Sequence, residues 1–313
     1  MDLTEAVAGA TTVVATGART QWEVGGPVPI GTDVRAPGGI VRYEPADMTV
    51  TVGAGTSFAQ LDAVLAEHGQ QCPLDPRNLD ATVGGIIACG LSGARRLRHG
   101  PTRDQVLEVR VVTADGRMVK GGGPTVKNVT GYDLPRLFTG SFGTLGVLSQ
   151  VTLRCRPRAP HAQWFVTDEP HALYRASTML WAGDRVHVLL EGAADDIAAA
   201  GLTPAAAPAF PDGPCRGRIS VAPGAIRALA VDLRDVAWLA ELGVGTVHVA
   251  APDTAGLVAA RKAAHAQGGW MLREAGDDGA DGFGRPLPNL AVMQRIKAAF
   301  DPTGKFSPGR LPL

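Results

Sequence analysis

The chain has 313 residues, and its 30 basic and 30 acidic side chains give a formal net charge of zero. This balance excludes the bulk electrostatic attraction that favours nucleic acid or an acidic membrane surface. Hydrophobic residues make up 45% of the chain, which is enough for a sizeable core, and the 40 glycines indicate a loop-rich globular protein. The cysteines match no CxxC or Cys/His zinc spacing, so we expect structural thiols, no metal site and no iron–sulfur cluster held by this chain alone; they are Cys72, Cys89, Cys155 and Cys215.

The N-terminal residues carry Asp2 and Glu5 but no Lys or Arg before a short apolar run, which is the wrong polarity for a signal peptide. No segment reaches the roughly 18 consecutive apolar residues that a membrane-spanning helix requires. We therefore expect a cytoplasmic protein that would reach the inner membrane only through partner proteins.

A short β-branched run at residues 12–16 leads into the turn Thr16-Gly17-Ala18-Arg19-Thr20. A strand that enters a Gly-bearing turn can place consecutive N–H groups where a pyrophosphate binds, although a plain hairpin turn fits the same residues. Further strands are predicted at 34–43 and 48–52. A helix is predicted at 57–68, with Thr56 or Ser57 as its N-cap and Gly69 at its end.

The stretch 73–147 contains three glycine clusters, separated by Ser, Thr and Asn residues and by short β-branched runs. They are Gly84-Gly85 with Gly90 and Gly93, then Gly121 to Gly123, then Gly140-x-x-Gly143-x-x-Gly146. Glycine lets backbone N–H groups approach a ligand closely. Several such loops on one stretch indicate a backbone cradle for a large, anionic, planar cofactor. A Rossmann domain is only weakly supported, because the GxGxxG pattern that begins at Gly53 has Phe58 in its sixth position.

Strands at 106–112 and 118–119 flank the hairpin residues 114–117, and another strand is predicted at 146–156, which together suggest a mixed α+β domain. A basic cluster precedes them, but no aromatic residues interleave with it as base stacking on nucleic acid would require. We expect a solvated loop there, or a contact with a phosphate or a partner subunit; the cluster is Arg95, Arg96, Arg98 and His99.

The second half begins with a predicted linker at 158–164 and contains an Ala/Pro-rich exposed loop at 205–214. Strands and helices alternate, which suits a small antiparallel sheet with helices on one face. His248 lies in one of these strands, where packing is a more ordinary role than catalysis. The predicted strands are 186–191, 218–221, 246–251 and 270–273, and the predicted helices are 225–242 and 254–267.

The chain resembles the FAD-binding domain of the vanillyl-alcohol oxidase/PCMH flavoprotein family, and within it the small FAD-binding subunits of bacterial glycolate oxidases. The matching motifs are Pro73-Leu74-Asp75-Pro76, Ala81-Thr82-x-Gly84-Gly85, Ser92-Gly93, His99-Gly100-x-x-Arg103-Asp104, Lys127-Asn128-x-x-Gly131-Tyr132-Asp133-Leu134 and Gly140-Ser141-x-Gly143-Thr144-x-Gly146-Val147. The resemblance implies a PCMH-type fold of two α+β subdomains with a small antiparallel-sheet cap. It places the FAD-binding domain at 1–156, a ferredoxin-like cap or substrate domain at 157–280, and a returning C-terminal segment at 281–313.

The resemblance also implies the cofactor and its contacts. Because neither His nor Cys occupies the 16–20 turn, the FAD is expected to be noncovalent. Ser307 stands where the family usually has an Asn that helps to hold the flavin ring. The expected contacts are Thr16, Gly17, Ala18, Arg19, Thr20, Pro73, Leu74, Asp75, Thr82, Gly84, Gly85, Gly90, Ser92, Gly93, Arg103, Gly143, Gly146, Val147 and Ser307.

The implied function is the FAD-binding subunit of a 2-hydroxy-acid dehydrogenase, acting on glycolate with a larger catalytic flavoprotein subunit and an iron–sulfur subunit. Two alternatives stay open, namely a self-sufficient FAD oxidoreductase and a structural subunit with a vestigial flavin site. The His-bearing Gly-Asp-Gly-Asn motif of the family's catalytic subunits is missing, so no catalytic base is predicted. Arg273, Arg285 and Arg310 are candidates to hold a substrate carboxylate.

Overall fold

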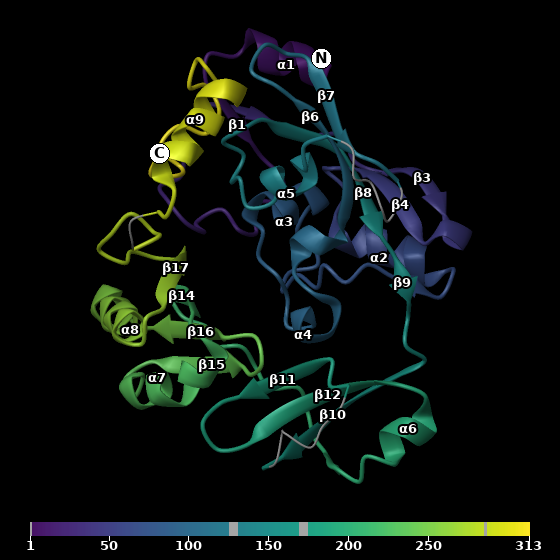
Figure 1. Ribbon diagram of the computed structural model, residues 1–313, viewed down its shortest axis with the longest axis vertical. Helices are drawn as coiled ribbons and strands as arrows, with labels where there is room; N and C mark the ends of the chain where they lie inside the picture. The colour runs from purple at the N-terminus through teal and green to yellow at the C-terminus, as the bar shows by residue number, and fades with distance from the viewer. Residues whose placement is uncertain (1, 125–130, 169–174, 285–286) are drawn as a thin grey trace.

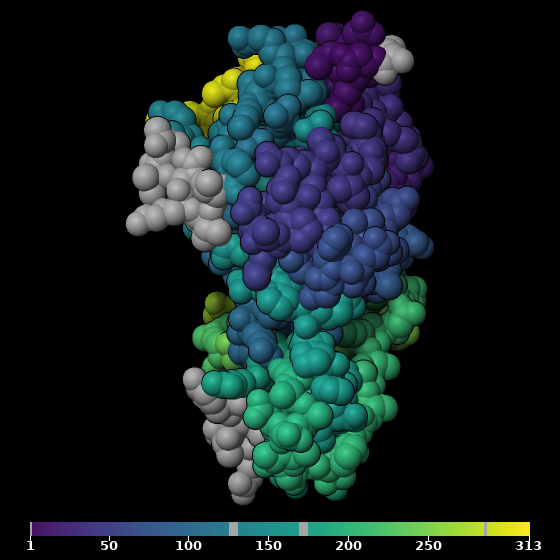
Figure 2. All heavy atoms as spheres, turned by 90° about the vertical axis from the view of Figure 1, so that its right-hand side faces the viewer, coloured from purple at the N-terminus to yellow at the C-terminus, as the bar shows by residue number. Residues whose placement is uncertain are grey.

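The computed structural model describes residues 2–124, 131–168, 175–284 and 287–313. These residues form two lobes stacked along the long axis of the molecule (Figures 1 and 2). The first lobe is built on a five-stranded sheet and the second on an eight-stranded sheet. The motif residues 127–130 and the candidate Arg285 lie outside the described residues.

The five-stranded sheet of the first lobe is antiparallel throughout, and α2 and α3 pack against it. Beside it, β1 (Val13–Ala15) pairs in parallel with β2 (Thr32–Val34). The strand order is β3 (Ile40–Glu44), β4 (Thr49–Gly53), β8 (Val147–Arg154), β6 (Val106–Val112) and β7 (Met118–Gly122). Shorter elements of this lobe are α1 (Leu3–Gly9), η1 (Pro45–Asp47), β5 (Gln70–Gln71), α4 (Arg96–His99), η2 (Thr102–Gln105), α5 (Leu134–Phe138) and β9 (Arg156–Pro157).

Local sequence signals set the two helices that cover this sheet. Helix α2 (Phe58–Ala66) begins at Ser57, whose hydroxyl accepts from the Gln60 amide in a capping box, and it buries Phe58, Leu61 and Leu65. Helix α3 (Val83–Cys89) begins at Thr82, whose hydroxyl accepts from the Gly85 amide. It ends at Gly90, where φ is +69°. The capping therefore places the first turn of α3 beside the loop that follows β1.

The second lobe is one antiparallel sheet with its helices at the outside (Figure 1). Helices α7 (Ile226–Asp232) and α8 (Thr254–Ala266) pack on the half formed by β14 to β17, while α6 (Ala194–Ala198) packs on the other half. The strand order is β13 (Thr203–Pro204), β10 (His161–Thr167), β12 (Val186–Gly192), β11 (Thr178–Trp181), β15 (Ala237–Glu241), β16 (Thr246–Ala251), β14 (Cys215–Ser220) and β17 (Trp270–Ala275). A short η4 (Pro223–Ala225) precedes α7.

After β17 the chain returns to the first lobe. Helix α9 (Leu290–Phe300) packs Ile296 and Phe300 against the first core. The last residues then run beside β1, where the Val13 amide donates to the Lys305 carbonyl at 2.8 Å and the Ser307 amide donates to the Val13 carbonyl at 2.9 Å. The buried Asp301 carboxylate stabilises this turn by accepting from the Phe306 amide at 2.8 Å and from Lys297 Nζ at 2.6 Å.

The α+β fold with antiparallel sheets is confirmed, but three predicted elements were wrong. The helix predicted at 225–242 ends at Asp232, and the strand β15 follows, because β15 pairs with both β11 and β16 and so buries Leu239 and Ala240. The linker predicted at 158–164 contains the start of β10. The strand predicted at 34–43 is broken, since the chain turns at Pro37-Gly38-Gly39 between β2 and β3.

No helix among the described residues is long and apolar enough to cross a membrane.

Candidate functional site

A cavity in the first lobe, called the first cavity here, lies where four segments meet. They are the loop after β1, the start of α3, the loop that enters β8, and the C-terminal residues around Ser307 and Arg310. Residues far apart in sequence thus line one space. The C-terminal hydrogen bonds to β1 hold the last of these segments in place.

The loop after β1 presents backbone donors to this cavity. Within the described part of the chain, the amide N–H groups of Gly17, Ala18, Arg19 and Thr20 have no hydrogen-bond partner. Arg19 adopts a left-handed backbone with φ +58°, which turns the chain within this run. Consecutive unpaired N–H groups in a turn are the backbone arrangement that binds phosphate oxygens.

Side-chain contacts hold this loop in place. Thr16 Oγ1 donates to Asp33 Oδ1 at 2.9 Å, and Arg35 Nη1 donates to the Gly17 carbonyl at 3.0 Å. The Arg19 guanidinium pairs with Asp33 and lies over the Trp22 ring, 4.7 Å from its centroid. The loop is therefore stabilised through its side chains and carbonyls, which leaves its amides available.

Close approach explains the glycines at Gly17 and Gly84. A Cβ at Gly17 would overlap Thr82 Oγ1, the hydroxyl that caps α3, and a Cβ at Gly84 would lie 2.9 Å from the Ala54 carbonyl oxygen. The amides of Gly84 and Gly85 already donate, to the Ala54 carbonyl and to Thr82 Oγ1 respectively. The first turn of α3 thus contributes a close backbone surface, whereas the free donors come from residues 17–20.

Another part of the wall comes from the loop before β8 and from the C-terminal turn. Phe142 and Gly143 both have left-handed backbones, with φ of +53° and +69°, and so does the buried Ser307, with φ +39°. A Cβ at Gly143 would meet Ser307 Oγ at 3.5 Å, an ordinary contact, so these two turns lie directly against each other. Both turns line the first cavity.

Two further side chains line the cavity, and both have a pKa shifted from its usual value. Burial raises the pKa of the Cys89 thiol to about 12, so the thiol stays protonated at neutral pH. Arg310 is buried and its pKa is lowered by desolvation. Its guanidinium donates to the Trp22 carbonyl at 2.6 Å and to the Gly26 carbonyl at 3.0 Å, and these bonds tie the C-terminus to the residues after the 16–20 loop.

The predicted cofactor contacts divide into three groups. The first group lines the first cavity: Thr16, Gly17, Ala18, Arg19, Thr20, Thr82, Gly84, Gly85, Gly143, Gly146, Val147 and Ser307. Asp75, Ser92 and Gly93 line a second cavity between the lobes. Pro73, Leu74, Gly90 and Arg103 line neither of these two cavities; Leu74 is in the core, Gly90 caps α3, and Arg103 is half-exposed beside Asp104.

Sequence reasoning missed several residues of the first cavity. Gln21 and Trp22 follow the predicted turn directly, so a longer reading of that loop would have included them. Cys89 and Phe142 had no such signal, because they reach the cavity only when α3 and the loop before β8 pack together. The additional lining residues include Gln21, Trp22, Gly55, Ala88, Cys89 and Phe142. Arg310, a candidate to hold a substrate carboxylate, also lines this cavity.

The basic cluster around α4 joins the two lobes. Arg95 pairs with Asp75 in its own lobe at 2.8 Å and with Glu191 of β12 at 3.1 Å. Arg98 donates to Ser177 Oγ at 3.0 Å and to the Glu191 carbonyl at 2.8 Å. These bonds to the second lobe correct the prediction of a solvated loop. Arg273 is likewise used within the chain, since it donates to the Gly25 carbonyl at 2.6 Å.

The described residues contain no group of three or more His, Cys, Asp or Glu side chains that could hold a metal ion. All four cysteines are free thiols, and three of them are buried.

The fold and the first cavity are those expected of a protein that binds a cofactor with a diphosphate, because unpaired amides and close-packed glycines meet in one space. Residues 3–122 match the family described as FAD binding domain. This part of the chain is thus a PCMH-type FAD-binding domain, and its cofactor is FAD. Over residues 3–122, the predicted resemblance to an FAD-binding domain of the PCMH type is confirmed.

Relatives with curated names agree with this assignment. The chain is 41% identical over 157 residues to glycolate oxidase subunit GlcE of Escherichia coli K12, an alignment that covers 49% of this chain and 45% of that protein. It is 44% identical over 114 residues to a D-lactate dehydrogenase of Archaeoglobus fulgidus, covering 36% of this chain and 26% of that protein. The chain thus aligns with less than half the length of either relative.

A solved structure has the same fold at low sequence identity. The structure of an alkyldihydroxyacetonephosphate synthase superposes with a TM-score of 0.67 at 13% identity, covering 95% of this chain and 71% of that chain. The likeness extends over both lobes, whereas the sequence match to the FAD-binding domain ends at residue 122.

Proposed function

We propose that this chain binds FAD without a covalent bond and serves as the flavin subunit of a dehydrogenase for small 2-hydroxy acids, with glycolate as the expected substrate. The observation that carries the proposal is the run of four unpaired amides at Gly17–Thr20, set in the wall of a glycine-lined cavity in an FAD-binding domain. The similarity to a glycolate oxidase subunit and to a D-lactate dehydrogenase supports the substrate class.

The residues present fit this cofactor. The amides of residues 17–20 would hold the diphosphate, and the turns at Gly143 and Ser307 would form another part of the wall. When bound, a flavin accepts a hydride from a hydroxy acid and passes the electrons on. The protein's own part is to bind and orient the cofactor, and Asp301 holds the turn that carries Ser307 to the cavity.

The chemistry of Cys89 supports noncovalent binding. It is the cysteine that lines the first cavity, and none of the lining residues is a histidine. A nucleophilic thiol has to be a thiolate, and the raised pKa of about 12 leaves Cys89 almost wholly protonated at neutral pH. Attachment to the flavin through this side chain is therefore disfavoured.

The proposed assembly has a larger catalytic flavoprotein subunit and an iron–sulfur subunit that takes the electrons. The glycolate oxidase relative is named as a subunit, which supports the proposal that this chain works in a complex. A self-sufficient oxidoreductase is the second candidate, and a polar cavity beside the first one favours it.

Purified full-length chain tests the proposal. We expect a flavin absorbance spectrum, and acid precipitation should leave the flavin in the supernatant; flavin in the pellet would contradict noncovalent binding. FAD at about 1,000 times its dissociation constant should add roughly 4 kcal/mol of stability, read as a thermal shift. No spectrum and no shift would refute the proposal and leave a structural subunit.

Anaerobic glycolate then distinguishes the two enzymatic candidates. Bleaching of the flavin only after the partner subunits are added supports the subunit, whereas bleaching of the isolated chain supports a self-sufficient oxidoreductase. A flavin that binds but stays oxidised with glycolate under both conditions would refute the 2-hydroxy-acid assignment.

A further inference from the structure

The second cavity lies between the lobes and adjoins the first one. Thr20 and Gln21 line both cavities, so the flavin cavity and the second cavity share a wall. The first lobe contributes the loops 75–78 and 91–95, and the second lobe contributes strands of its sheet together with the loop around Phe210. A small molecule in this space would sit next to the proposed flavin.

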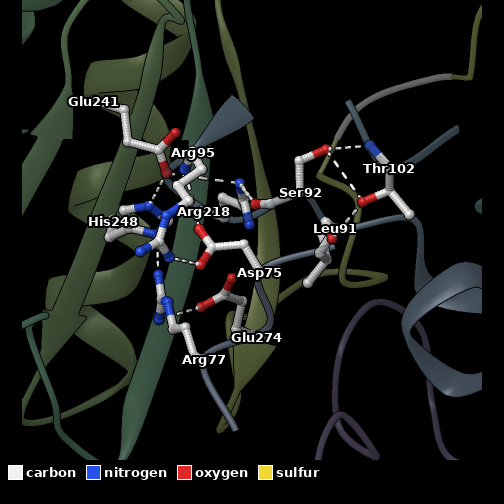
Figure 3. A network of polar contacts seen from close by, with 10 residues as sticks. All are labelled: Asp75, Arg77, Leu91, Ser92, Arg95, Thr102, Arg218, Glu241, His248 and Glu274. Carbon is white, nitrogen blue, oxygen red and sulfur yellow. Dashed lines mark hydrogen bonds and ion pairs between the residues drawn. The ribbon is translucent and has the colours of Figure 1, made fainter. Parts of the chain in front are cut away.

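Two arginines, one from each lobe, converge on this cavity (Figure 3). Arg218 on β14 is largely buried, with its side chain 12% exposed, and it donates to the Ser92 carbonyl at 2.5 Å. Arg77 lies over the Phe210 ring and pairs with Glu274 at 3.3 Å. Arg218 and Arg216 both help to lower the pKa of Arg77, after the larger effect of desolvation, so the cations lie close enough to repel one another. Each guanidinium has five N–H donors, and neither uses all of them in these bonds.

A buried acid–imidazole pair lies directly beside the arginines, with Arg218 Nη2 3.7 Å from Glu241 Oε1. His248 Nε2 is 2.5 Å from Glu241 Oε1, and the Arg77 guanidinium bonds to Nδ1 of the same ring. Since a guanidinium can only donate, Nδ1 accepts and Nε2 carries the proton that is shared with Glu241. Desolvation keeps the pKa of His248 well below its usual value, so this imidazole is neutral. The ring thus acts as a donor to Glu241 rather than as a charged partner.

The other carboxylate oxygen of Glu241 is unused. Glu241 Oε2 is buried and has no hydrogen-bond partner among the described residues, although the side chain lines the cavity. Thr178 Oγ1, on the same cavity wall, also lacks one. Buried polar atoms in folded proteins are nearly always bonded. The terminal torsion of a carboxylate is broad, so a small rotation presents Glu241 Oε2 to a ligand hydroxyl.

We propose that the second cavity binds a small 2-hydroxy carboxylate, with its carboxylate on Arg77 and Arg218 and its hydroxyl donating to Glu241. This assignment rests on the FAD binding of the proposed function, because the adjoining flavin would supply the oxidant. Since it places the substrate and the base on this chain, it goes with the second candidate, the self-sufficient oxidoreductase. A flavin bound in the adjoining cavity would supply the acceptor for the hydride, with both of its electrons, that leaves when the C2–H bond breaks. The O–H bond breaks as the C=O bond forms, and the hydroxyl proton goes to the Glu241 carboxylate, which His248 orients.

The titration of Glu241 agrees with this role. Burial raises its pKa to about 7, against the opposite effect of Arg218, Arg77 and Arg96, while the nearby Asp75 raises it further. His248 faces the same carboxylate from β16 and is neutral. A carboxylate with a pKa near neutrality can both accept and release a proton at physiological pH.

Calorimetric titration of the FAD-loaded full chain tests the site with three probes. Glycolate should bind more tightly than acetate, which lacks the hydroxyl, and ethylene glycol, which lacks the carboxylate, should not bind. Arg218→Gln and the more exposed Arg77→Gln should each weaken glycolate binding at least tenfold. Glu241→Gln should keep acetate binding and abolish the preference for glycolate. Arg216→Gln is the matched control, because Arg216 lines the same cavity but pairs with the exposed Asp212. The affinity of this variant for glycolate should stay within twofold of the wild-type value.

Flavin absorbance and circular dichroism, measured on the same samples, separate the possible failures. A folded chain that binds FAD but gives no heat with glycolate would overturn this inference and leave the flavin proposal standing. Equal losses of glycolate affinity in Arg218→Gln, Arg77→Gln and Arg216→Gln would also overturn it. The arginines would then act only through the positive charge of the cavity and not through a direct contact with the ligand. If no FAD binds, the proposed function fails, and glycolate titration of the flavin-free chain still decides the carboxylate site.

Discussion

Gly17→Ala probes the contact on which the cofactor loop depends. A Cβ at this position would overlap Thr82 Oγ1 and lie 3.2 Å from Thr82 Cβ and Cγ2. Gly17 does not have a left-handed backbone, so the substitution acts through this contact alone. The Thr82 hydroxyl must move, and α3 then loses its N-cap bond to the Gly85 amide.

The expected magnitude follows from the two groups displaced. Loss of an N-cap costs about 1 kcal/mol, and forcing a side chain out of a packed site costs about another 1 kcal/mol. Gly17→Ala should therefore destabilise the chain by roughly 2 kcal/mol, and Thr82→Ala by about 1 kcal/mol. The double variant should cost only about 1 kcal/mol, because the alanine at 82 removes Oγ1, the atom that the new Cβ would overlap, and Cγ2, and leaves only the Cβ contact at 3.2 Å.

Urea unfolding of the FAD-free variants measures these stabilities, and quenching of FAD fluorescence measures the affinity. We expect Gly17→Ala to weaken FAD about tenfold, which corresponds to about 1.4 kcal/mol. Gly192→Ala is the control, since nothing lies near a Cβ there, and it should change stability by less than about 0.5 kcal/mol. Additive effects of Gly17→Ala and Thr82→Ala would refute the reasoning, and so would a neutral Gly17→Ala.

Three further predictions concern ionisable groups in the interior. The pKa of Glu241 is raised from 4.5 to about 7, so the folded chain binds more protons than the unfolded chain between these values, and this carboxyl's contribution to stability falls as pH rises through 7. As pH rises from 4.5 to 8, the free energy of unfolding of Glu241→Gln should increase by about 3 kcal/mol relative to that of wild type, as urea unfolding can measure. A difference that stays constant with pH would contradict this. Cys89, with its pKa near 12, should be alkylated by iodoacetamide at pH 8 on the order of a thousandfold more slowly than in the unfolded chain, as mass spectrometry can show. Asp301→Ala should cost about 3 kcal/mol in urea unfolding, because it leaves the Lys297 ammonium without its carboxylate; a loss below about 0.5 kcal/mol would count against that role.

Local chemistry determined much of the fold and part of the first cavity. Ser57 and Thr82 mark the starts of α2 and α3 because their hydroxyls bond to amides within the next three residues. The turn after β1 was recognisable from a β-branched strand that runs into Gly17. These signals act over a few residues, so the sequence alone carries them. The loops of an FAD-binding domain could therefore be predicted.

Tertiary packing decided the rest. The residues of β15 fit a helix as well as a strand, and only pairing with β11 and β16 selects the strand. Arg77 and His248 are 171 positions apart, so no local pattern could place them in one hydrogen-bonded cluster with Glu241. The pKa of Glu241 depends on burial between the two lobes, and burial is a property of the assembled fold. Short-range hydrogen bonds can thus be predicted from the sequence. The charge pairs and shifted pKa values of the second cavity arise only once distant segments have packed together.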